Sequence, residues 1–369
     1  MDTLRGQHVP CCSMIVYQNH KKLFQYTAGF RDAAGTIPAD GSETYNIFSC
    51  SKVMTTCAVM QLIGEGRLDP DDPVGKYLPA WANPKIEDEN GLRDAGQPLT
   101  IRALMSMQGG LDYDLTAPPI MAALEKYGKA ATTRQLIDAL AEKPLHFEPM
   151  SDFMYSLCHD VLAAVVEVIS GQRFSDYLSE HIWQPLGLKK TGFRFTEDYR
   201  KTQADMYVFE GFDRPLKNVP NDDVSYRLAP EYESGGAGLI TDTEDYARFL
   251  DAIACGGTTA EGKVILSQEM IDLWRTPQLG AKSRATFDTW GRKGYSYALG
   301  VRSRVDPANG RGGPAGEFGW DGAAGAYLFI DPENRLSGFF TMHVLNFGYC
   351  YDIIHPTLQT LIYDGLNRP

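Results

Sequence analysis

The chain has 369 residues, of which 43% are hydrophobic and 22% charged, and this ordinary globular composition excludes disordered, collagen-like and coiled-coil proteins. Its formal net charge of −12 argues against binding to nucleic acid or to anionic membrane surfaces, which both require clustered cations. The start of the sequence lacks the features of a signal peptide, and no apolar run reaches about 18 residues. We therefore expect a cytoplasmic protein with no membrane partner, or an exported one if a leader has been trimmed.

The beginning of the chain is predicted to form strands and then a helix. Residues 13–17 and 23–27 are β-rich runs separated by a polar turn, which predicts a hairpin. From Ser49 to about Gly64, apolar residues recur at every third or fourth position, which indicates a helix. Residues 68–73 are rich in proline and aspartate and predict a surface loop.

The middle of the chain is predicted to be mainly helical. Helices with capped starts are expected at Thr100 and Thr133. Amphipathic runs at 157–169 and 174–182 indicate two longer helices. Gly171 fits the end of the first of these.

The last part of the chain returns to strands after two further helices. Asp242 resembles a helix cap, and another helix is expected after Ser267. Strands are predicted at 297–302, 326–330 and 336–343, and a closing helix follows them.

Strand-forming segments at both ends of the sequence therefore bracket a helical middle. Because their apolar faces must be buried, the economical arrangement is an α/β (α+β) fold with one mostly antiparallel sheet built from both ends and flanked by helices. We expect a single domain with two lobes. Residues 1–80 with 240–369 would form a sheet-and-helix lobe, and residues 80–240 a mainly helical lobe.

Ser49 and Lys52 are a candidate nucleophile and base. Ser49 and Lys52 are three residues apart, and on a helix such residues share one face with Cβ atoms about 5–6 Å apart. Unpaired N–H groups at a helix start favour a nucleophilic oxygen and a developing oxyanion. The lysine must be neutral, or pass its proton to a partner, and burial can lower its pKa. The spacing alone also fits a solvated helix face, since chance gives about one such pair in a chain of this length.

Other chemistries find little support. The sequence has no Gly-x-Ser-x-Gly elbow, no nucleotide- or phosphate-binding loop and no metal-ligand spacing among its seven histidines, so we predict neither a cofactor nor a metal site. Seven cysteines without a Cys-x-x-Cys pair indicate free, buried thiols. Cys50 is interpreted as a packing residue because an adjacent helical side chain points about 100° away. We interpret His159 and Asp160 as helix surface or local hydrogen bonding.

Further blocks surround the Ser–Lys pair. They are residues 45–52 (YNIFSCSK), 99–105 with 110–111, 147–149 leading to 155–156, 170–171, 185–187 and 235–239. In order and spacing these blocks resemble the serine β-lactamase and penicillin-binding-protein superfamily, in particular class C β-lactamases and the related family VIII carboxylesterases. The resemblance covers nearly the whole chain. It implies a β-lactamase/transpeptidase-like fold with the active site in the cleft between the two lobes.

The resemblance also implies an acyl-enzyme mechanism. Ser49 would be the nucleophile, and Lys52 with Tyr155 would remove its proton. A Lys52 cation beside the phenol would favour a Tyr155 phenolate that relays the proton. The backbone N–H groups of Ser49 and Ala323 would form the oxyanion hole.

The substrate-recognition end departs from the family pattern. Leu157 replaces the asparagine expected two residues after the tyrosine, and an apolar side chain cannot orient an amide. Trp320, Asp321 and Gly322 stand where the family has a cation, a hydroxyl and glycine. Asp321 would repel a substrate carboxylate, whereas Trp320 would line an acyl or alcohol pocket or, equally well, be a core aromatic. We assign these four residues to substrate binding.

We therefore predict a carboxylesterase whose partner is a small-molecule ester or amide. A β-lactamase, a D-aminopeptidase or DD-peptidase and an acyltransferase are alternatives on the same scaffold. A non-catalytic binding or sensor protein is an alternative of another class, suggested by the two altered motifs. The oligomeric state stays open.

Overall fold

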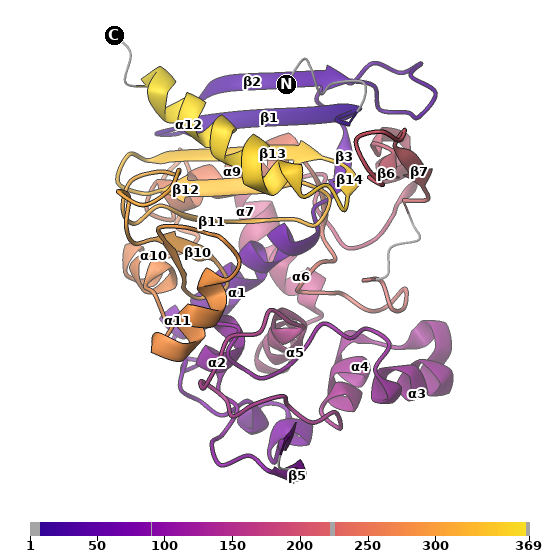
Figure 1. The fold of residues 1–369 in the computed structure, drawn as a ribbon, viewed down its shortest axis with the longest axis vertical. Helices are drawn as coiled ribbons and strands as arrows, with labels where there is room; N and C mark the ends of the chain where they lie inside the picture. Colours follow the sequence, from indigo (N-terminus) through magenta and orange to yellow (C-terminus); the bar gives the residue numbers. More distant parts are fainter. Residues whose placement is uncertain (1–7, 90, 222–225, 367–369) are drawn as a thin grey trace.

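A seven-stranded antiparallel sheet is the centre of the fold (Figure 1). The computed structural model of the chain describes residues 8–89, 91–221 and 226–366. In spatial order the strands are β2 (Lys21–Gly29), β1 (Cys11–Gln18), β13 (Leu336–Met342), β12 (Tyr327–Asp331), β11 (Phe318–Asp321), β10 (Arg302–Arg304) and β9 (Tyr295–Tyr297).

The sheet joins the two ends of the chain, as the sequence predicts. β1 pairs antiparallel with β13, with Cys12 opposite Met342. The predicted hairpin is formed by β1 and β2, whose turn residues Asn19 and His20 have φ angles of 50° and 64°. Two successive residues with positive φ are the signature of a tight hairpin turn whose twist matches its strands.

Side chains of the sheet alternate between two cores. Ile15 and Tyr17 of β1 belong to the main core, whereas Met14 and Val16 belong to a second core. The main core includes residues of α1 and α9, and partly buried residues of α12 pack against the second. Figure 1 shows α12 crossing one face of the sheet, so helices cover it on both sides.

Helices dominate the chain between the N-terminal strands and the C-terminal ones. They are α1 (Ser51–Gly64), α2 (Ile101–Met105), α3 (Pro118–Tyr127), α4 (Thr133–Leu140), α5 (Cys158–Ser170), α6 (Phe174–Leu178), α7 (Gln184–Leu186), α8 (Glu197–Thr202), α9 (Thr243–Ala254), α10 (Gln268–Arg275), α11 (Ala281–Asp288) and α12 (His355–Leu366). Helix α1 is buried on nearly all sides and contacts both α5 and α10. It therefore connects the sheet to the helical region that Figure 1 shows beyond it.

Three small sheets accompany the main sheet among the described residues. They are β3 (Thr44–Asn46) with β8 (Ile240–Asp242), β4 (Lys85–Asp88) with β5 (Gly91–Asp94), and β14 (Val344–Leu345) with β6 (Met206–Val208) and β7 (Lys217–Val219). The pair β3 and β8 matters most for the site, because β3 leads directly into the turn that carries Ser49.

Most predicted helices are found where the sequence places them. Asp242 and Ser267 cap α9 and α10, and Gly171 ends α5 with a φ of 73°. Thr100 caps α2, but the cap of α4 is Thr132, one residue before the predicted position, because Thr132 and Gln135 form a capping box.

The predicted strand at 297–302 is wrong. The chain turns between β9 and β10, and Gly300 at φ 75° lies in that turn. Apolar residues therefore continue through a hairpin turn, and only the glycine marks the reversal. The division into lobes at residues 80 and 240 stays a prediction.

All seven cysteines are free; six are buried and Cys255 is half-buried. This confirms the expectation of free thiols. Within the part of the chain that the structure describes, no helix has the length and apolar character that a membrane span needs.

Candidate active site

Ser49 lies in a short helical turn (Phe48–Cys50) that runs into α1. Phe48, directly before it, has a φ of 46°, a left-handed conformation that is uncommon for a bulky side chain. The surrounding structure holds this turn from both sides, since Ile47 N–H donates to Leu239 O and the Tyr246 hydroxyl donates to Cys50 O. Strained residues fixed in this way are typical of functional sites.

Lys52 is fully buried one helical turn after the serine. Its Nζ lies 2.7 Å from Gly236 O, 3.2 Å from Ser49 Oγ and 3.2 Å from the Tyr113 hydroxyl. Burial lowers the pKa of Lys52 to about 7, although Asp160 acts in the opposite direction. At neutral pH much of this lysine is therefore an uncharged amine that can accept the proton of Ser49.

Tyr155 lies against Lys52 and Trp320. Lys52 Nζ is 4.6 Å from the centre of the Tyr155 ring, and Trp320 Nε1 donates a 2.9 Å hydrogen bond to the Tyr155 hydroxyl. The Tyr155 and Trp320 rings stack with centroids 5.5 Å apart. These contacts place the phenol between the lysine and the predicted recognition residue.

The charge state of Tyr155 differs from the expectation. Burial raises the pKa of Tyr155 well above its ordinary value, and hydrogen bonds with Ser49 and Trp320 oppose this only in part. Lys52 does not stabilise a phenolate, because burial drives the lysine toward its own neutral form. Tyr155 is thus a neutral phenol that can donate a proton.

The segment after β11 approaches the nucleophile closely. A Cβ atom on Gly322 would come within 2.2 Å of Ile47 O, so only glycine allows this approach. The Tyr351 hydroxyl is 3.0 Å from Gly322 O and 2.9 Å from Ala323 O and holds the segment from its other side. Ala323 and Ser49 consequently line the same cavity.

This cavity has a volume of about 320 Å³. Its lining consists of Ser49, Tyr113, Tyr155, Tyr226, Trp290, Arg292, Trp320, Asp321, Gly322, Ala323 and Tyr351. Six of the predicted site residues are in this set, and Lys52 lies behind Ser49 at hydrogen-bond distance. Sequence reasoning missed the other tyrosines, Trp290 and Arg292. The one available signal was that Tyr113 follows the resembling block that ends at residue 111.

Leu157 is not brought to the cavity. It is the residue that precedes α5, its side chain is buried in the main core, and its N–H donates to Asp112 O. The structure therefore gives no support to the assignment of Leu157 to substrate binding.

Asp321 lines the cavity but does not present a free negative charge. Its Oδ2 lies 3.0 Å from both Arg292 Nη2 and Arg302 Nη1, and its Oδ1 lies 3.1 Å from His355 Nδ1. Burial opposes the charge, but Arg302 and Arg292 outweigh it and hold the pKa of Asp321 well below its usual range. The prediction that Asp321 would repel a substrate carboxylate is therefore wrong, because two arginine cations neutralise this one anion.

His159 and Asp160 are not on a helix surface, contrary to the prediction. Both are fully buried. His159 Nε2 lies 3.1 Å from Thr56 Oγ1, and Asp160 Oδ1 accepts a 2.7 Å hydrogen bond from the Tyr232 hydroxyl. These partners are distant in sequence, so the two residues tie α5 to its neighbours.

One group among the described residues has the donor atoms of a metal site. His20, Asp251 and Cys255 have ligand atoms within 4.8 Å of one another. None of them lines the cavity, and His20 Nδ1 already lies at hydrogen-bond distance, 2.9 Å, from Asp251 Oδ2.

Comparisons with known proteins agree with this geometry. A family model described as Beta-lactamase matches residues 1–348. The chain is 28% identical over 361 residues to esterase EstB of Burkholderia gladioli, which covers 90% of this chain and 86% of EstB. It is 27% identical over 349 residues to acyltransferase calJ of Penicillium decumbens, which covers 89% of this chain and 82% of calJ.

A solved structure shows the same fold. EstCE1, described as a hydrolase with promiscuous acyltransferase activity, superposes with a TM-score of 0.79 at 24% identity over 95% of this chain and 93% of EstCE1. The fold predicted from the sequence is thereby confirmed.

Proposed function

The chain belongs to the beta-lactamase family, and on that premise we propose that it is a serine carboxylesterase that cleaves small esters through an acyl-enzyme on Ser49. The observation that carries the proposal is the 3.2 Å separation of Ser49 Oγ and Lys52 Nζ, at a lysine whose burial lowers its pKa to about 7. A hydroxyl beside a neutral amine is an activated nucleophile.

Acylation begins when Ser49 Oγ attacks the ester carbonyl and Lys52 Nζ takes the hydroxyl proton. The carbonyl oxygen becomes an oxyanion, which the backbone N–H groups of Ser49 and Ala323 receive. The C–O bond to the leaving alcohol then breaks. Tyr155 gives its proton to the alcohol oxygen, and the Lys52 ammonium returns a proton to Tyr155.

Deacylation repeats these steps with water in place of the alcohol. Lys52 takes a proton from water while the water oxygen attacks the acyl carbon, and the oxyanion again lies at Ser49 and Ala323. Collapse of this intermediate releases the acid and returns the proton to Ser49 Oγ. The nucleophile and both proton carriers are then as they began.

The recognition end supports an ester over an amide substrate. Trp320, which stands where the family has a cation, forms a stacked aromatic wall of the cavity with Tyr155. The similarity to EstB, an esterase at 28% identity, supports the same choice.

An acyltransferase is the second candidate. Its support is the similarity to calJ, an acyltransferase at 27% identity over 89% of this chain. The two functions share the acyl-enzyme and differ in whether water or an acceptor alcohol resolves it.

A side-by-side assay tests the proposal. Purified protein should hydrolyse short-chain nitrophenyl esters with a kcat/KM well above that for a chromogenic cephalosporin. A faster reaction with the cephalosporin would overturn the esterase assignment. Adding a small alcohol and quantifying the transfer ester against the free acid separates the two candidates, since a transferase would form mainly the new ester.

A further inference from the structure

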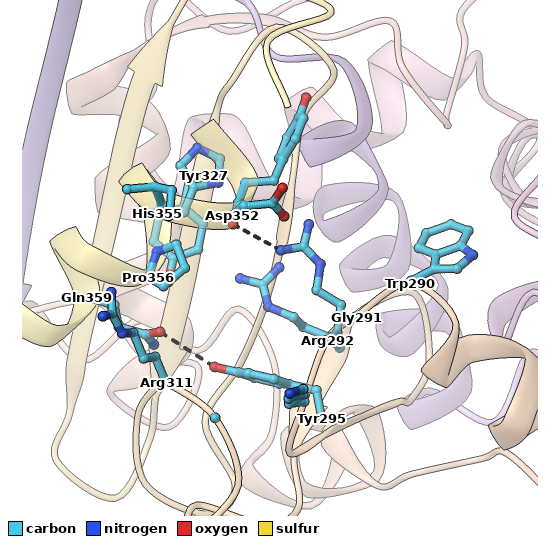
Figure 2. Close-up of a pocket in the computed structure, with 15 residues that line it drawn as sticks. Trp290, Gly291, Arg292, Tyr295, Arg311, Tyr327, Asp352, His355, Pro356 and Gln359 are labelled. Atoms are coloured by element: carbon cyan, nitrogen blue, oxygen red, sulfur yellow. Dashed lines mark hydrogen bonds between the residues drawn. The ribbon is translucent and has the colours of Figure 1, made fainter. Parts of the chain in front are cut away.

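A second pocket of about 280 Å³ adjoins the catalytic cavity (Figure 2). It lies between the segment that carries Trp290 to Arg292 and the α12 residues His355, Pro356 and Gln359, and Figure 2 shows residues of both elements around it. We call it the cationic pocket because Arg292, Lys293, Arg302 and Arg311 line it.

Positive charge outweighs negative charge in this pocket. Three acids lie near its four cations. Asp352 is exposed, Asp321 pairs with both Arg292 and Arg302, and the buried Glu317 accepts from the Tyr295 hydroxyl and has its pKa raised by burial. Burial lowers the pKa of His355, so that side chain adds little charge near neutral pH. A cluster of cations is unusual in a chain with a formal net charge of −12, and it concentrates positive potential where an anion could enter.

The buried arginine of the pocket is held in place. Arg302 is only 3% exposed, and its guanidinium lies between the rings of Tyr295 and Tyr327, 5.5 and 5.3 Å from their centroids. Its Nη1 is bonded to Asp321. A cation fixed in this way costs no ordering when a ligand arrives.

The cationic pocket and the catalytic cavity share part of their walls. Trp290, Arg292 and Tyr351 line both. Arg292 is half-buried and uses one Nη on Asp321 and the other on Tyr351 O, at 3.0 and 3.4 Å. A group attached to an ester bound at Ser49 can therefore reach the pocket past Arg292.

We propose that the cationic pocket binds a carboxylate carried by the ester substrate, so that the preferred substrates are esters with one free acid group. This inference rests on the proposed esterase function. A planar carboxylate matches the fork of N–H donors on a guanidinium, and such charge-assisted contacts are the strong ones.

Two pairs of esters test the proposal and locate the acid group. One pair carries the group on the acyl side. It consists of mono-nitrophenyl glutarate, which has a free acid, and methyl nitrophenyl glutarate, in which that acid is a methyl ester. The other carries it on the leaving side: 3-butyryloxybenzoate and its methyl ester. We expect at least one anionic ester to exceed its neutral counterpart about 10- to 100-fold in kcat/KM, mainly through KM, which is the usual scale of one charge-assisted contact.

Variants assign the preference to the pocket. Arg311→Gln and Arg292→Gln should each lower the ratio of anionic to neutral kcat/KM. Arg134→Gln, which removes a charge from an i,i+4 pair on α4, should leave the ratio unchanged. The preference of the wild type should also fall as salt is added, because screening weakens attraction between exposed charges.

Two results would overturn the inference while leaving the esterase function intact. One is hydrolysis of the neutral esters with no preference for either anionic ester. The other is a preference that survives in the Arg292→Gln/Arg311→Gln double variant. Failure to hydrolyse any of the four esters would instead overturn the proposed function, and this inference with it.

Discussion

Lys52, which lies behind Ser49, and Asp321, which lines the catalytic cavity, are both largely removed from solvent, and their surroundings differ in kind. Within the described residues Lys52 has no carboxylate within 4.0 Å, whereas Asp321 has two arginines and a histidine at 3.0 to 3.1 Å. Burial therefore lowers the pKa of Lys52 to about 7, while the arginines hold the pKa of Asp321 well below its usual range. One group is kept ready to exchange a proton, and the other is fixed as an anion.

This contrast distinguishes Lys52, which takes part in the reaction, from Asp321, which shapes the charge that a substrate meets. A buried lysine without a carboxylate in ion-pair contact lowers the stability of the fold but supplies a neutral amine for the reaction, so we expect its removal to affect activity far more than stability. A carboxylate such as Asp321, which is paired with more than one cation, stabilises the fold and also leaves positive charge for a ligand.

The largest expected effect is that of Lys52→Met. Loss of the amine should lower kcat/KM for a neutral nitrophenyl ester by about 10⁴-fold. The free energy of unfolding should be unchanged or higher, because methionine removes the cost of burying an ionisable group. Urea denaturation measures the second effect. Lys201→Met, at a side chain that is 71% exposed, is the control and should change neither quantity. A Lys52→Met protein with full activity would contradict the role of the amine.

Asp321→Asn should act mainly on stability. Removing one partner of a buried ion pair costs about 3–5 kcal/mol, because the arginines are left without their counter-charge. Since the pKa of Asp321 is lower in the folded state, its stabilisation is present above the unfolded value of about 3.9 and is lost as the pH falls below it. The difference in free energy of unfolding between wild type and variant should therefore be larger at pH 7 than at pH 3. Asp138→Asn, in a half-exposed pair on α4, is the control. An equal difference in free energy of unfolding at both pH values would show that Asp321 is not held as an anion.

The two phenols near Lys52 should differ in importance. Tyr155→Phe removes the proton donor to the leaving group and should lower kcat/KM by about 10²- to 10⁴-fold. Tyr113→Phe removes one hydrogen bond to Lys52 and should cost about tenfold or less. The same ester assay measures both variants. A larger loss in Tyr113→Phe would transfer the relay role to Tyr113.

The pH dependence should report the lowered pKa of the lysine. Because neutral Lys52 is the active form and its pKa is about 7, kcat/KM should rise with pH through that value and fall about tenfold per unit below it. The profile is measured with a neutral ester from pH 5 to 9, with thermal unfolding at each pH as a check on the fold. A rise centred near 10 would mean that burial does not shift this lysine.

The fold was predictable wherever a local pattern determines structure. The hairpin of β1 and β2 and the helix α5 follow from alternation and helical periodicity, which are local properties. The strand predicted at 297–302 is wrong because the reversal at Gly300 needs only one glycine within an apolar run.

The catalytic site, too, was predictable only where local spacing determines it. The spacing of Ser49 and Lys52 is local and was recognised from the sequence. The charge seen by a ligand near Asp321 depends on Arg292 and Arg302, which are 29 and 19 residues away and reach it only through tertiary folding. For this reason the expected repulsion had the wrong sign.

Ser49 is the proposed nucleophile, and intact-protein mass spectrometry with a fluorophosphonate tests this role. We predict a single covalent adduct on the wild type, the same adduct on Ser51→Ala, whose buried hydroxyl accepts from Leu239 N–H, and none on Ser49→Ala. An unmodified wild type, or an adduct that persists in Ser49→Ala, would contradict the assignment of Ser49 as the nucleophile.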